Sequence, residues 1–461
     1  FIITVKFLVE LKLKRFDKTH PSFRAKVWAC PDSVRGMKVL DREKFLRNVK
    51  VSALKLSTDK VSSIIGYCKP YTLKLVNFKA VQNLSEEEKP FEKIIYLNPE
   101  KVTSWKDIPE DHRLSFNKND VTEDNFFFKE LQVTYENLSY EDIFKAVLPE
   151  GVETVSGFSQ VGHIIHLNLR DHLLEYKSLI GTVLIDKIAT CRTVINKTQV
   201  IDNVYRNFNL EILAGDEDYL VNVNENHCKF QFDFSKVYWN PRLGKEHERI
   251  VKLLKPGDVL FDVFSGVGPF AVPAAKKKCR VFANDLNPES YKALNLNAKY
   301  NNVNMSLFKS FNLDGKEFIC EIFKDFIRDC CTGKENISSD VKIHVTMNLP
   351  ALAVDFLKYF NGLIDDKQLI DKFNLDIVVY VYTFVSGDNQ VEEAKKTVIE
   401  KMGRNVTSEI LGVSFVRNVS PKRDMMRVSI KLTKEILFGI DRNTEDIEPP
   451  LKKKCVESIG E

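Results

Sequence analysis

The most constraining feature of this 461-residue sequence is a regular alternation of strand-like and helix-like segments between about residues 237 and 436. Continuous apolar runs such as LDIVVYVY are typical of strands that are buried on both faces. Strands are expected at 259–264, 279–285, 304–311, 342–349 and 375–385, and helices at 271–278, 289–301, 315–330, 351–363 and 389–402. Segments 408–420 and 424–432 resemble a closing antiparallel hairpin. This order predicts an α/β domain with a doubly wound, mainly parallel, Rossmann-like sheet.

The rest of the chain is expected to form two smaller domains, because 461 residues exceed what one hydrophobic core usually organises. Residues 1–135 mix short strand-like and helix-like pieces with charged loops, which predicts an α+β domain. Residues 136–236 contain a helix that ends at a Pro/Gly stop, followed by several alternating segments, including a strand expected at 182–187. They predict a second α+β domain with a polar sheet face. The polar tail, 437–461, is predicted to be disordered.

Composition restricts the function. With 68 Lys and Arg against 64 Asp and Glu the net charge is only +4, so any nucleic-acid site must come from local basic patches. Nine cysteines without a C-x-x-C pair argue for a reducing compartment and against a zinc site. His163 and His166 form an H-x-x-H pair without further ligands at suitable spacing, so no metal is expected. No apolar run approaches the roughly 20 residues that span a bilayer, so no membrane association is expected.

Two segments bear on location. The opening FIITVKFLVELKLKR is basic and amphipathic, and it fits either a mitochondrial presequence or a strand. PPLKKK in the tail fits either a nuclear signal or a solvated charge run. Neither segment by itself decides the location.

The sharpest local motif is FDVFSGVGPFAVPAA, residues 261–275. Gly266 and Gly268 lie between a strand and a helix, where a turn without side chains lets a ligand approach the backbone and the helix N-terminus. Asp285 ends the second strand and could accept hydrogen bonds from ribose hydroxyls. Dinucleotide-binding Rossmann domains use the same device, so these residues do not separate the two classes.

Three further features favour a different cofactor. Asp262 ends the first strand, where its carboxylate can face the aminoacyl end of a ligand. Asp314 and Gly315 follow the third strand, from which an adenine amino group can be hydrogen-bonded. The fourth strand ends in Asn348-Leu349-Pro350, in which the amide can hold a planar nitrogen nucleophile while the proline fixes the turn.

This set of residues resembles class I S-adenosylmethionine-dependent methyltransferases that act on nitrogen. The alternative is a phosphate-binding or nicotinamide-binding Rossmann domain.

A second group of polar residues precedes the sheet in VYWNPRLGKEHERI, residues 237–250. If a helix begins near Lys245, Glu246 projects from its first turn and Arg242 lies on the loop before it. A carboxylate there could remove a proton from a bound base. The alternative is that Glu246 and Glu248 complement the helix dipole and pair with Arg249.

Long stretches of the chain resemble one family. They include GHIIHLNLRDHLLEYKSLIGTVLIDK, the run from NKTQVIDNVYRNF to KVYWNPRLGKEHERIV, and then DVFSGVGPFAVPAA, NDLNPES, NLDGKEF and MNLP. In this order they are similar to the archaeal and eukaryotic tRNA (guanine(37)-N1)-methyltransferases over roughly residues 30–435. Asn-Leu-Pro replaces the Asn-Pro-Pro of archaeal members, and Asn-Pro-Arg around Arg242 replaces a frequent Asn-Ser-Arg; neither change removes a functional group.

The resemblance implies roles for particular residues. Glu246 matches the proposed general base of the family, Arg206 in VYRNF matches an arginine that contacts O6 of guanine, and Asn348 completes the catalytic set. The expected contacts of the cofactor S-adenosylmethionine are His247, Asp262, Phe264, Gly266, Asp285, Leu286, Asn287, Asp314, Gly315, Asn348 and Pro350.

The resemblance also implies a partner and a reaction. Family members act as monomers and methylate G37 in cytoplasmic and mitochondrial tRNAs, so mitochondrial matrix, nucleus and cytoplasm are all open as locations. In tRNA-Phe this methylation is the first step toward wybutosine, and it supports reading-frame maintenance. Two other hypotheses remain open. One is an aminocarboxypropyl transferase of the wybutosine pathway, and the other is a non-catalytic tRNA-binding protein.

Overall fold

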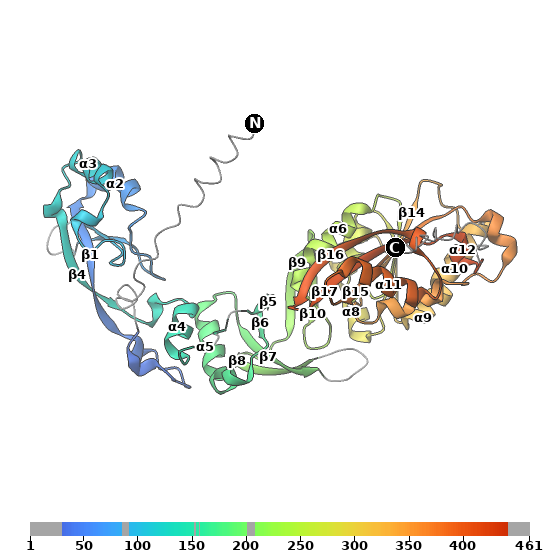
Figure 1. Ribbon diagram of the computed structural model, residues 1–461, viewed down its shortest axis with the longest axis horizontal. Helices are drawn as coiled ribbons and strands as arrows, with labels where there is room; N and C mark the ends of the chain where they lie inside the picture. The colour runs from blue at the N-terminus through green and yellow to red at the C-terminus, as the bar shows by residue number, and fades with distance from the viewer. Residues whose placement is uncertain (1–29, 85–91, 152–153, 156, 201–207, 441–461) are drawn as a thin grey trace, which may run out of the picture. The chain divides into compact units, whose positions relative to one another are not determined.

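The computed structural model describes residues 30–84, 92–151, 154–155, 157–200 and 208–440 (Figure 1). The chain divides into two compact units, each with its own hydrophobic core. The first unit comprises Phe1–Phe158, Ile165–Asn196 and Glu211–Asp216, and the second comprises Ser159–Ile164, Lys197–Leu210 and Glu217–Glu461.

The first unit contains a four-stranded antiparallel sheet of order β2-β3-β1-β4. Its strands are β1 (Arg47–Ser57), β2 (Val81–Asn83), β3 (Glu92–Tyr96) and β4 (Phe126–Val133). Side chains of β1 point alternately to opposite faces of the sheet, and both faces are covered. Val51 and Ala53 belong to one core, whereas Leu54 and Leu56 pack in another with α2 (Val61–Cys68) and α3 (Glu110–Asn117).

The prediction of a strand at residues 182–187 is wrong, because these residues form the second half of the helix α5 (Lys177–Lys187). Buried positions in α5 include Leu179, Ile180, Val183 and Leu184, a spacing that only a helix places on one side. The six residues of TVLIDK are too few to show that period, and their β-branched side chains favour a strand. Around α5 lie α4 (Tyr140–Val147), β6 (Ile164–Leu167), β7 (Thr193–Val200) and β8 (Phe208–Gly215).

The second unit contains a seven-stranded sheet of order β13-β12-β11-β14-β15-β17-β16. Its strands are β11 (Val259–Asp262), β12 (Arg280–Asn284), β13 (Phe308–Phe311), β14 (Lys342–Met347), β15 (Asp376–Val385), β16 (Ile410–Ser420) and β17 (Arg423–Lys431). The first five strands in this order are parallel, and β17 runs antiparallel to both of its neighbours. The predicted doubly wound sheet and its closing hairpin are confirmed. Because the strand order reverses between β11 and β14, ligands are expected at the carboxyl ends of these strands.

Helices cover the sheet in two sets. One set packs with Phe261, Val345 and Val379 in a large core and consists of η10 (Phe318–Phe323), α10 (Lys324–Thr332), η11 (Ala353–Phe360) and α11 (Gln390–Met402). The other set is α6 (Gly244–Leu253), α7 (Ala271–Lys276) and α8 (Pro288–Tyr300). The helix expected at 351–363 is a tighter 3-10 turn, and the one at 315–330 contains a π-helical stretch, so both depart from ideal α-helix.

The second unit begins before residue 237, the predicted start of the methyltransferase domain. It includes β5 (Ser159–Val161) and the hairpin of β9 (Leu220–Glu225) and β10 (Cys228–Asp233). The backbone N–H groups of Lys229 and Gln231 in β10 donate to the side chains of Asn301 and Asn297, at 2.9 and 2.8 Å. The predicted domain boundaries remain a prediction, and this hairpin is fixed to α8.

At the other end, α12 (Lys434–Leu437) packs Leu437 and Phe438 into the core, so the fold continues into the predicted tail. Residues 441–461 lie outside the described part of the chain. None of the described helices is both long and apolar enough to cross a membrane.

Candidate active site

The glycine-rich turn between β11 and α7 has one packed side and one open side. Gly268 has φ +99°, and a Cβ there would lie 2.8 Å from side-chain carbons of both Leu294 and Val272. Gly266 has φ +54°, and a Cβ there would meet nothing within 4 Å. Gly268 therefore lets the turn pack against its own helices, whereas Gly266 leaves space through which a ligand can approach the backbone.

Asp262, the last residue of β11, has no exposed side-chain surface. Its Oδ1 accepts a hydrogen bond from the hydroxyl of Thr346 on β14, at 2.8 Å. Its Oδ2 is buried without a hydrogen-bond partner among the described residues. The pKa of Asp262 is raised to about 7, mainly by burial and to a smaller extent by the negative charge of Asp285, while the Thr346 hydrogen bond opposes the shift. A buried carboxyl group with one unused oxygen suits a cationic group of a ligand.

Asp285 is fixed by backbone donors. Its Oδ2 accepts from the N–H of Gly266 at 2.8 Å, and its Oδ1 accepts from the N–H of Asn287 at 2.9 Å. Burial raises the pKa of Asp285, although these hydrogen bonds oppose the shift. Asn287 uses its side chain within the protein, since it caps α8 and donates to the carbonyl of Lys236 at 2.7 Å. Leu286 is 39% exposed and offers an apolar surface beside Asp285.

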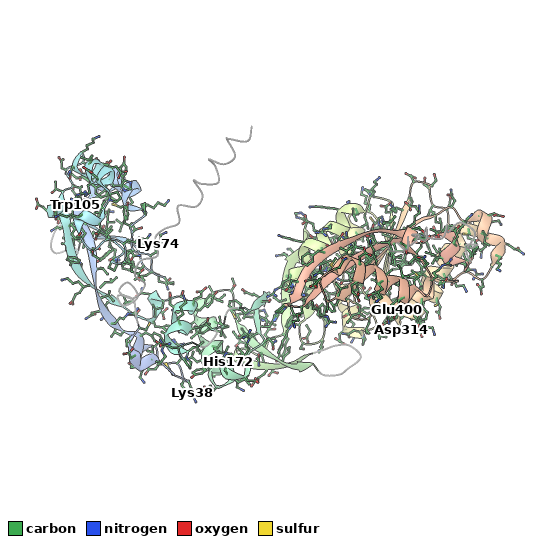
Figure 2. All side chains as sticks on the ribbon, viewed as in Figure 1. Lys38, Lys74, Trp105, His172, Asp314 and Glu400 are labelled. Carbon is green, nitrogen blue, oxygen red and sulfur yellow. The ribbon has the colours of Figure 1, made fainter. Side chains whose placement is uncertain are left out.

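Asp314 and Gly315 begin α9 (Gly315–Glu317) after β13, and Figure 2 labels Asp314 in this unit. The Asp314 side chain caps the helix by accepting from the N–H of Lys316 at 2.8 Å. Gly315 is buried, and a Cβ there would lie 2.9 Å from the ring of Phe264 and 3.0 Å from that of Phe356. The structure therefore brings Phe264, Asp314 and Gly315 together, and only glycine permits this contact.

Asn348 follows β14, and its Oδ1 is buried without a hydrogen-bond partner among the described residues. Two residues later, the carbonyl of Pro350 accepts from the N–H of Phe384 at 3.3 Å. This contact fixes the Asn-Leu-Pro turn to the end of β15. The amide oxygen is thus available to a donor on a ligand or a substrate base.

Glu246 lies in the first turn of α6 and is only 4% exposed. Its Oε1 accepts from the hydroxyl of Tyr382 at 3.0 Å and from Nη1 of Arg427 at 2.7 Å. Its Oε2 lies 3.0 Å from Nη1 of Arg249, but without hydrogen-bonding geometry. The ion pair between Glu246 and Arg249, one of the two alternatives from the sequence, is therefore present. Glu246 forms a second ion pair with Arg427, whose side chain is more buried than that of Arg249.

The other residues expected near Glu246 are placed as follows. His247 is buried, its Nδ1 lies 2.6 Å from Oε1 of Glu225 on β9, and its ring meets the edge of Phe270 at 4.7 Å. It joins α6 to the hairpin and to the end of the glycine-rich turn. Arg242 is exposed on the loop before α6. Arg206 lies outside the described residues.

Contacts through β15 connect these parts. The ring of Tyr382, which binds Glu246, lies 6.4 Å from that of Phe270 at the start of α7. Phe384, two residues further along β15, donates its backbone N–H to the carbonyl of Pro350. Glu246 and Asn348 are therefore linked through one strand to the Gly266 turn.

The site also carries unused buried oxygens. Buried polar atoms in folded proteins nearly always have partners. Within the described residues, four oxygens of the site lack one: Oδ2 of Asp262, Oγ of Ser265, Oδ1 of Asn348 and Oε2 of Glu246. A ligand with polar and cationic groups would satisfy them, and the open side of Gly266 gives it room. The residues present therefore fit S-adenosylmethionine, which carries an ammonium group, a sulfonium group and ribose hydroxyls.

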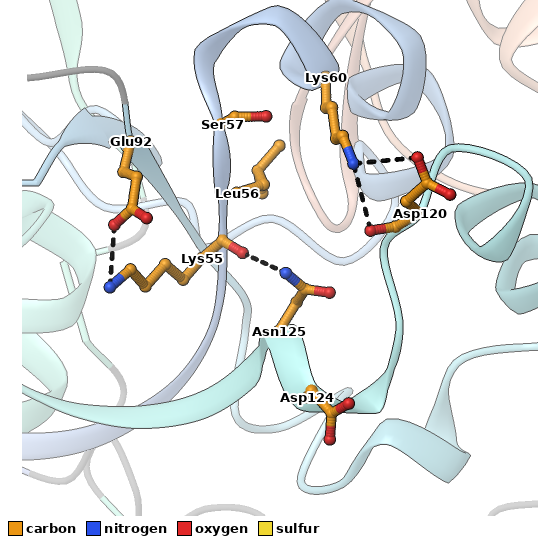
Figure 3. Close-up of a pocket in the computed structure, with 8 residues that line it drawn as sticks. All are labelled: Lys55, Leu56, Ser57, Lys60, Glu92, Asp120, Asp124 and Asn125. Atoms are coloured by element: carbon orange, nitrogen blue, oxygen red, sulfur yellow. Dashed lines mark hydrogen bonds and ion pairs between the residues drawn. The ribbon is translucent and has the colours of Figure 1, made fainter. Parts of the chain in front are cut away.

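A pocket of about 260 Å³ in the first unit is less suited to chemistry (Figure 3). Nζ of Lys55 lies 2.9 Å from Glu92, and Nζ of Lys60 lies 3.2 Å from Asp120, so both of its ammonium groups are paired with carboxylates. Among the described residues, no group of three or more His, Cys, Asp or Glu side chains is placed to hold a metal ion.

Several residues of the site were not predicted from the sequence. Asn284 at the end of β12 binds the backbone of Val263 and Leu313, and so fixes the loops after β11 and β13. Tyr382 and Arg427 hold Glu246 from two strands. Buried polar residues inside apolar strands are the signal that could have identified them, since such groups require partners.

Strand order and site together define a Rossmann-like class I methyltransferase domain. The sequence-family model of the TRM5/TYW2 methyltransferase domain matches residues 221–402, and that of the TYW2 N-terminal domain matches residues 140–218.

Comparison with curated proteins is more specific. The chain is 45% identical over 451 residues to the tRNA (guanine(37)-N(1))-methyltransferase of Anopheles gambiae, covering 95% of this chain and 78% of that protein. It is 41% identical over 449 residues to the enzyme of the same name from Homo sapiens, covering 96% and 86%. The chain belongs to the tRNA (guanine(37)-N1)-methyltransferase family.

Solved structures agree on the fold. Trm5b from Pyrococcus abyssi matches with a TM-score of 0.55 and 22% identity, over 83% of this chain and 99% of that chain. The structure of aTrm5 in complex with tRNALeu matches with a TM-score of 0.54 and 20% identity, over 83% and 100%.

Proposed function

We propose that this chain transfers a methyl group from S-adenosylmethionine to N1 of guanosine 37 in tRNA, with Glu246 as the general base. The observation that carries the proposal is the set of buried oxygens without hydrogen bonds, among the described residues, at or just after the ends of β11 and β14, together with the open space at Gly266 and a buried glutamate linked to the same turn. Buried groups of this kind at a sheet edge are typical of functional sites.

The cofactor, when bound, supplies a methyl group made electrophilic by the sulfonium. Asp285 would hold the ribose hydroxyls, because its carboxylate is already oriented by two backbone N–H groups. Asp262 would bind the cationic end of the cofactor through its unused Oδ2. Phe264, Leu286 and Asp314 would surround the adenine, with two apolar surfaces and one carboxylate. His247 and Asn287 would act by holding the loops that carry these contacts.

Guanine N1 needs help from two groups, because it carries a hydrogen and its lone pair is delocalised into the ring. Removal of that hydrogen is assigned to Oε2 of Glu246, the oxygen without a hydrogen bond. Negative charge then accumulates on O6, and Arg206 is proposed to stabilise it. Asn348 would position the base through its free Oδ1, while Pro350 fixes the turn.

The substrate is proposed to be tRNA with G37, bound by a monomer. The base must leave the stacked anticodon loop to reach the site, at a cost of a few kcal/mol that backbone contacts offset. Methylation of both cytoplasmic and mitochondrial tRNAs would place the protein in the matrix, the nucleus and the cytoplasm. Roles as the first step toward wybutosine in tRNA-Phe and in reading-frame maintenance are part of the same proposal.

Mass spectrometry of the product tests the proposal against its alternatives. The full chain is incubated with S-adenosylmethionine and an unmodified tRNA transcript with G37, and with a matched transcript in which position 37 is adenosine. Nucleosides from the first transcript should contain N1-methylguanosine, and those from the second should contain no methylated base at that position. An aminocarboxypropyl adduct would support the wybutosine-pathway alternative. Cofactor binding without any product would support a non-catalytic tRNA-binding protein.

A further inference from the structure

Three polar side chains lie side by side across the closing hairpin of the second unit. The register pairs Tyr382 on β15 with Arg427 on β17, and Arg427 with Ser414 on β16. Directly paired residues project from the same face of a sheet. Nη2 of Arg427 donates to the Ser414 hydroxyl at 3.1 Å, so the guanidinium is oriented from the edge strand.

Two members of this row contact Glu246, which lies on the helix α6. Tyr382 and Arg427 donate to the same oxygen, Oε1, at 3.0 and 2.7 Å. All three side chains are buried: Tyr382 is 0%, Glu246 4% and Arg427 7% exposed. A buried carboxylate with two donors on one oxygen has little rotational freedom, because turning it would break both bonds without access to water.

The two oxygens of Glu246 therefore differ. Oε1 is saturated by donors from the sheet, whereas Oε2 makes no hydrogen bond among the described residues. Oε2 is instead in an ion pair with Nη1 of Arg249 at 3.0 Å, and the Arg249 side chain is half exposed and can move without cost to the core. The arrangement fixes one oxygen by two hydrogen bonds and, within the residues that the structure describes, leaves the other without one.

The two groups that donate to Oε1 both keep their protons. Burial raises the pKa of Tyr382 well above its usual range, with a further contribution from Glu246, so the phenol remains a donor. Arg427 supplies a permanent positive charge and a guanidinium that only donates. Oε1 therefore accepts two hydrogen bonds and takes no proton from either partner.

We propose that Tyr382 and Arg427 are positioning residues for the methyl transfer: they fix Oε1 of Glu246 in place, so that Oε2 is presented to the substrate base as the proton acceptor. This inference rests on the proposed function, in which Glu246 is the general base. In the described part of the chain, the charged or titratable groups that face Glu246 are Tyr382 from β15, Arg427 from β17 and Arg249 from its own helix.

The kinetics of methyl transfer, measured with full-length protein and a G37 transcript, test this assignment. Arg427→Gln should lower kcat by about 10- to 10²-fold, because the carboxylate loses a donor that fixes its direction and a misplaced catalytic group costs about that much. KM for S-adenosylmethionine should stay within about twofold. Arg427→Lys can still donate to Oε1 and should lower kcat less. Tyr382→Phe keeps Arg427 and should lower kcat while KM for S-adenosylmethionine stays within about twofold.

Lys431→Gln is the matched control, since it removes a positive charge from the same strand where Lys431 pairs only loosely with Asp376, at 3.8 Å. Its kcat and its KM for S-adenosylmethionine should equal those of the unmodified protein. Melting temperatures are recorded for every variant, because an uncompensated buried carboxylate is destabilising. If Arg427→Gln does not fold, Arg427→Lys and Tyr382→Phe still decide.

Losses of activity that follow only the folded fraction, with kcat per folded molecule unchanged in all three variants, would show a purely structural role and overturn the proposal. Glu246→Gln separates this result from failure of the proposed function. If that variant retains full turnover, the base assignment itself is wrong. If it is inactive while kcat per folded molecule is unchanged in the other three variants, only the positioning role is rejected.

Discussion

Asp262 carries a buried carboxyl group, and the ionisation of this group affects both the stability of the fold and the binding of a ligand. Its pKa in the folded protein is raised to about 7, whereas an unfolded chain has the ordinary value of 3.8. The folded state therefore binds the proton more tightly, and this contribution to stability decreases as pH rises from about 4 to about 7. The charged form that appears above this range is the one suited to a cationic ligand.

Asp262→Asn should therefore change stability in a pH-dependent way. Without ligand, the variant should gain stability relative to the unmodified protein between pH 5 and pH 8, by about 2 kcal/mol. The reason is that only the unmodified protein must ionise a buried carboxyl group. Urea unfolding at both pH values measures the difference, and an equal difference at pH 5 and pH 8 would show that Asp262 does not titrate in this range.

The residues that could be found from the sequence are those in short local motifs. Gly266, Asp285 and Glu246 occur in segments whose spacing alone places them at strand ends or in a first helical turn. Tyr382 and Arg427 could not be found in this way, because 44 residues of strand, helix and hairpin separate them and their pairing depends on the register of β15 and β17. The irregular register of β16 with β17 makes such pairings harder still to predict.

The glycine-rich turn predicts different results for its two glycines. Gly266→Ala adds a methyl group to open space at φ +54°, so it should fold with a loss of about 1 kcal/mol and reduce cofactor affinity, because the methyl occupies the ligand's approach. Gly268→Ala places a methyl 2.8 Å from Leu294 and Val272, so its main effect should be on stability. Titration calorimetry with S-adenosylmethionine and thermal melting separate the two effects.

The opposite pattern, with Gly266→Ala binding the cofactor normally, would mean that the ligand does not use this face of the turn.

The strands and helices of residues 237–436 could be predicted from the sequence, since long buried strands and periodic helices are distinctive. The segment 182–187 could not, because its helical period became visible only over the whole of α5.

At the level of the whole chain, the near-neutral charge predicts how tRNA binding should respond to salt. The net charge is +4 over 461 residues, so affinity for tRNA must come from limited basic surfaces. Raising the salt concentration from 50 to 200 mM should increase KM for tRNA by an order of magnitude or more if several phosphates are contacted. The dissociation constant for S-adenosylmethionine should change much less. Equal salt sensitivity of both would contradict binding through the phosphate backbone.

The predicted domain boundaries remain a prediction, and the hairpin of β9 and β10 shows why sequence patterns locate such boundaries poorly. The alternating strands β9 and β10 look like those before them, so their pattern alone places them in the preceding domain. Only tertiary contacts, the side chains of Asn297 and Asn301 on the backbone of β10, fix this hairpin to the second unit. Sequence periodicity identifies elements, and it does not show which core an element joins.

The most direct test of the proposed chemistry is the single-turnover rate of Glu246→Gln with G37 tRNA, compared with Glu248→Gln on the exposed side of the same helix, where Glu248 pairs with Lys252 at 2.6 Å. Glu246→Gln should bind S-adenosylmethionine normally and lose about 10²- to 10⁴-fold in rate, because it removes a general base. Glu248→Gln should retain the full rate. A Glu246→Gln rate within about twofold of the unmodified enzyme would contradict the role of Glu246 as the general base.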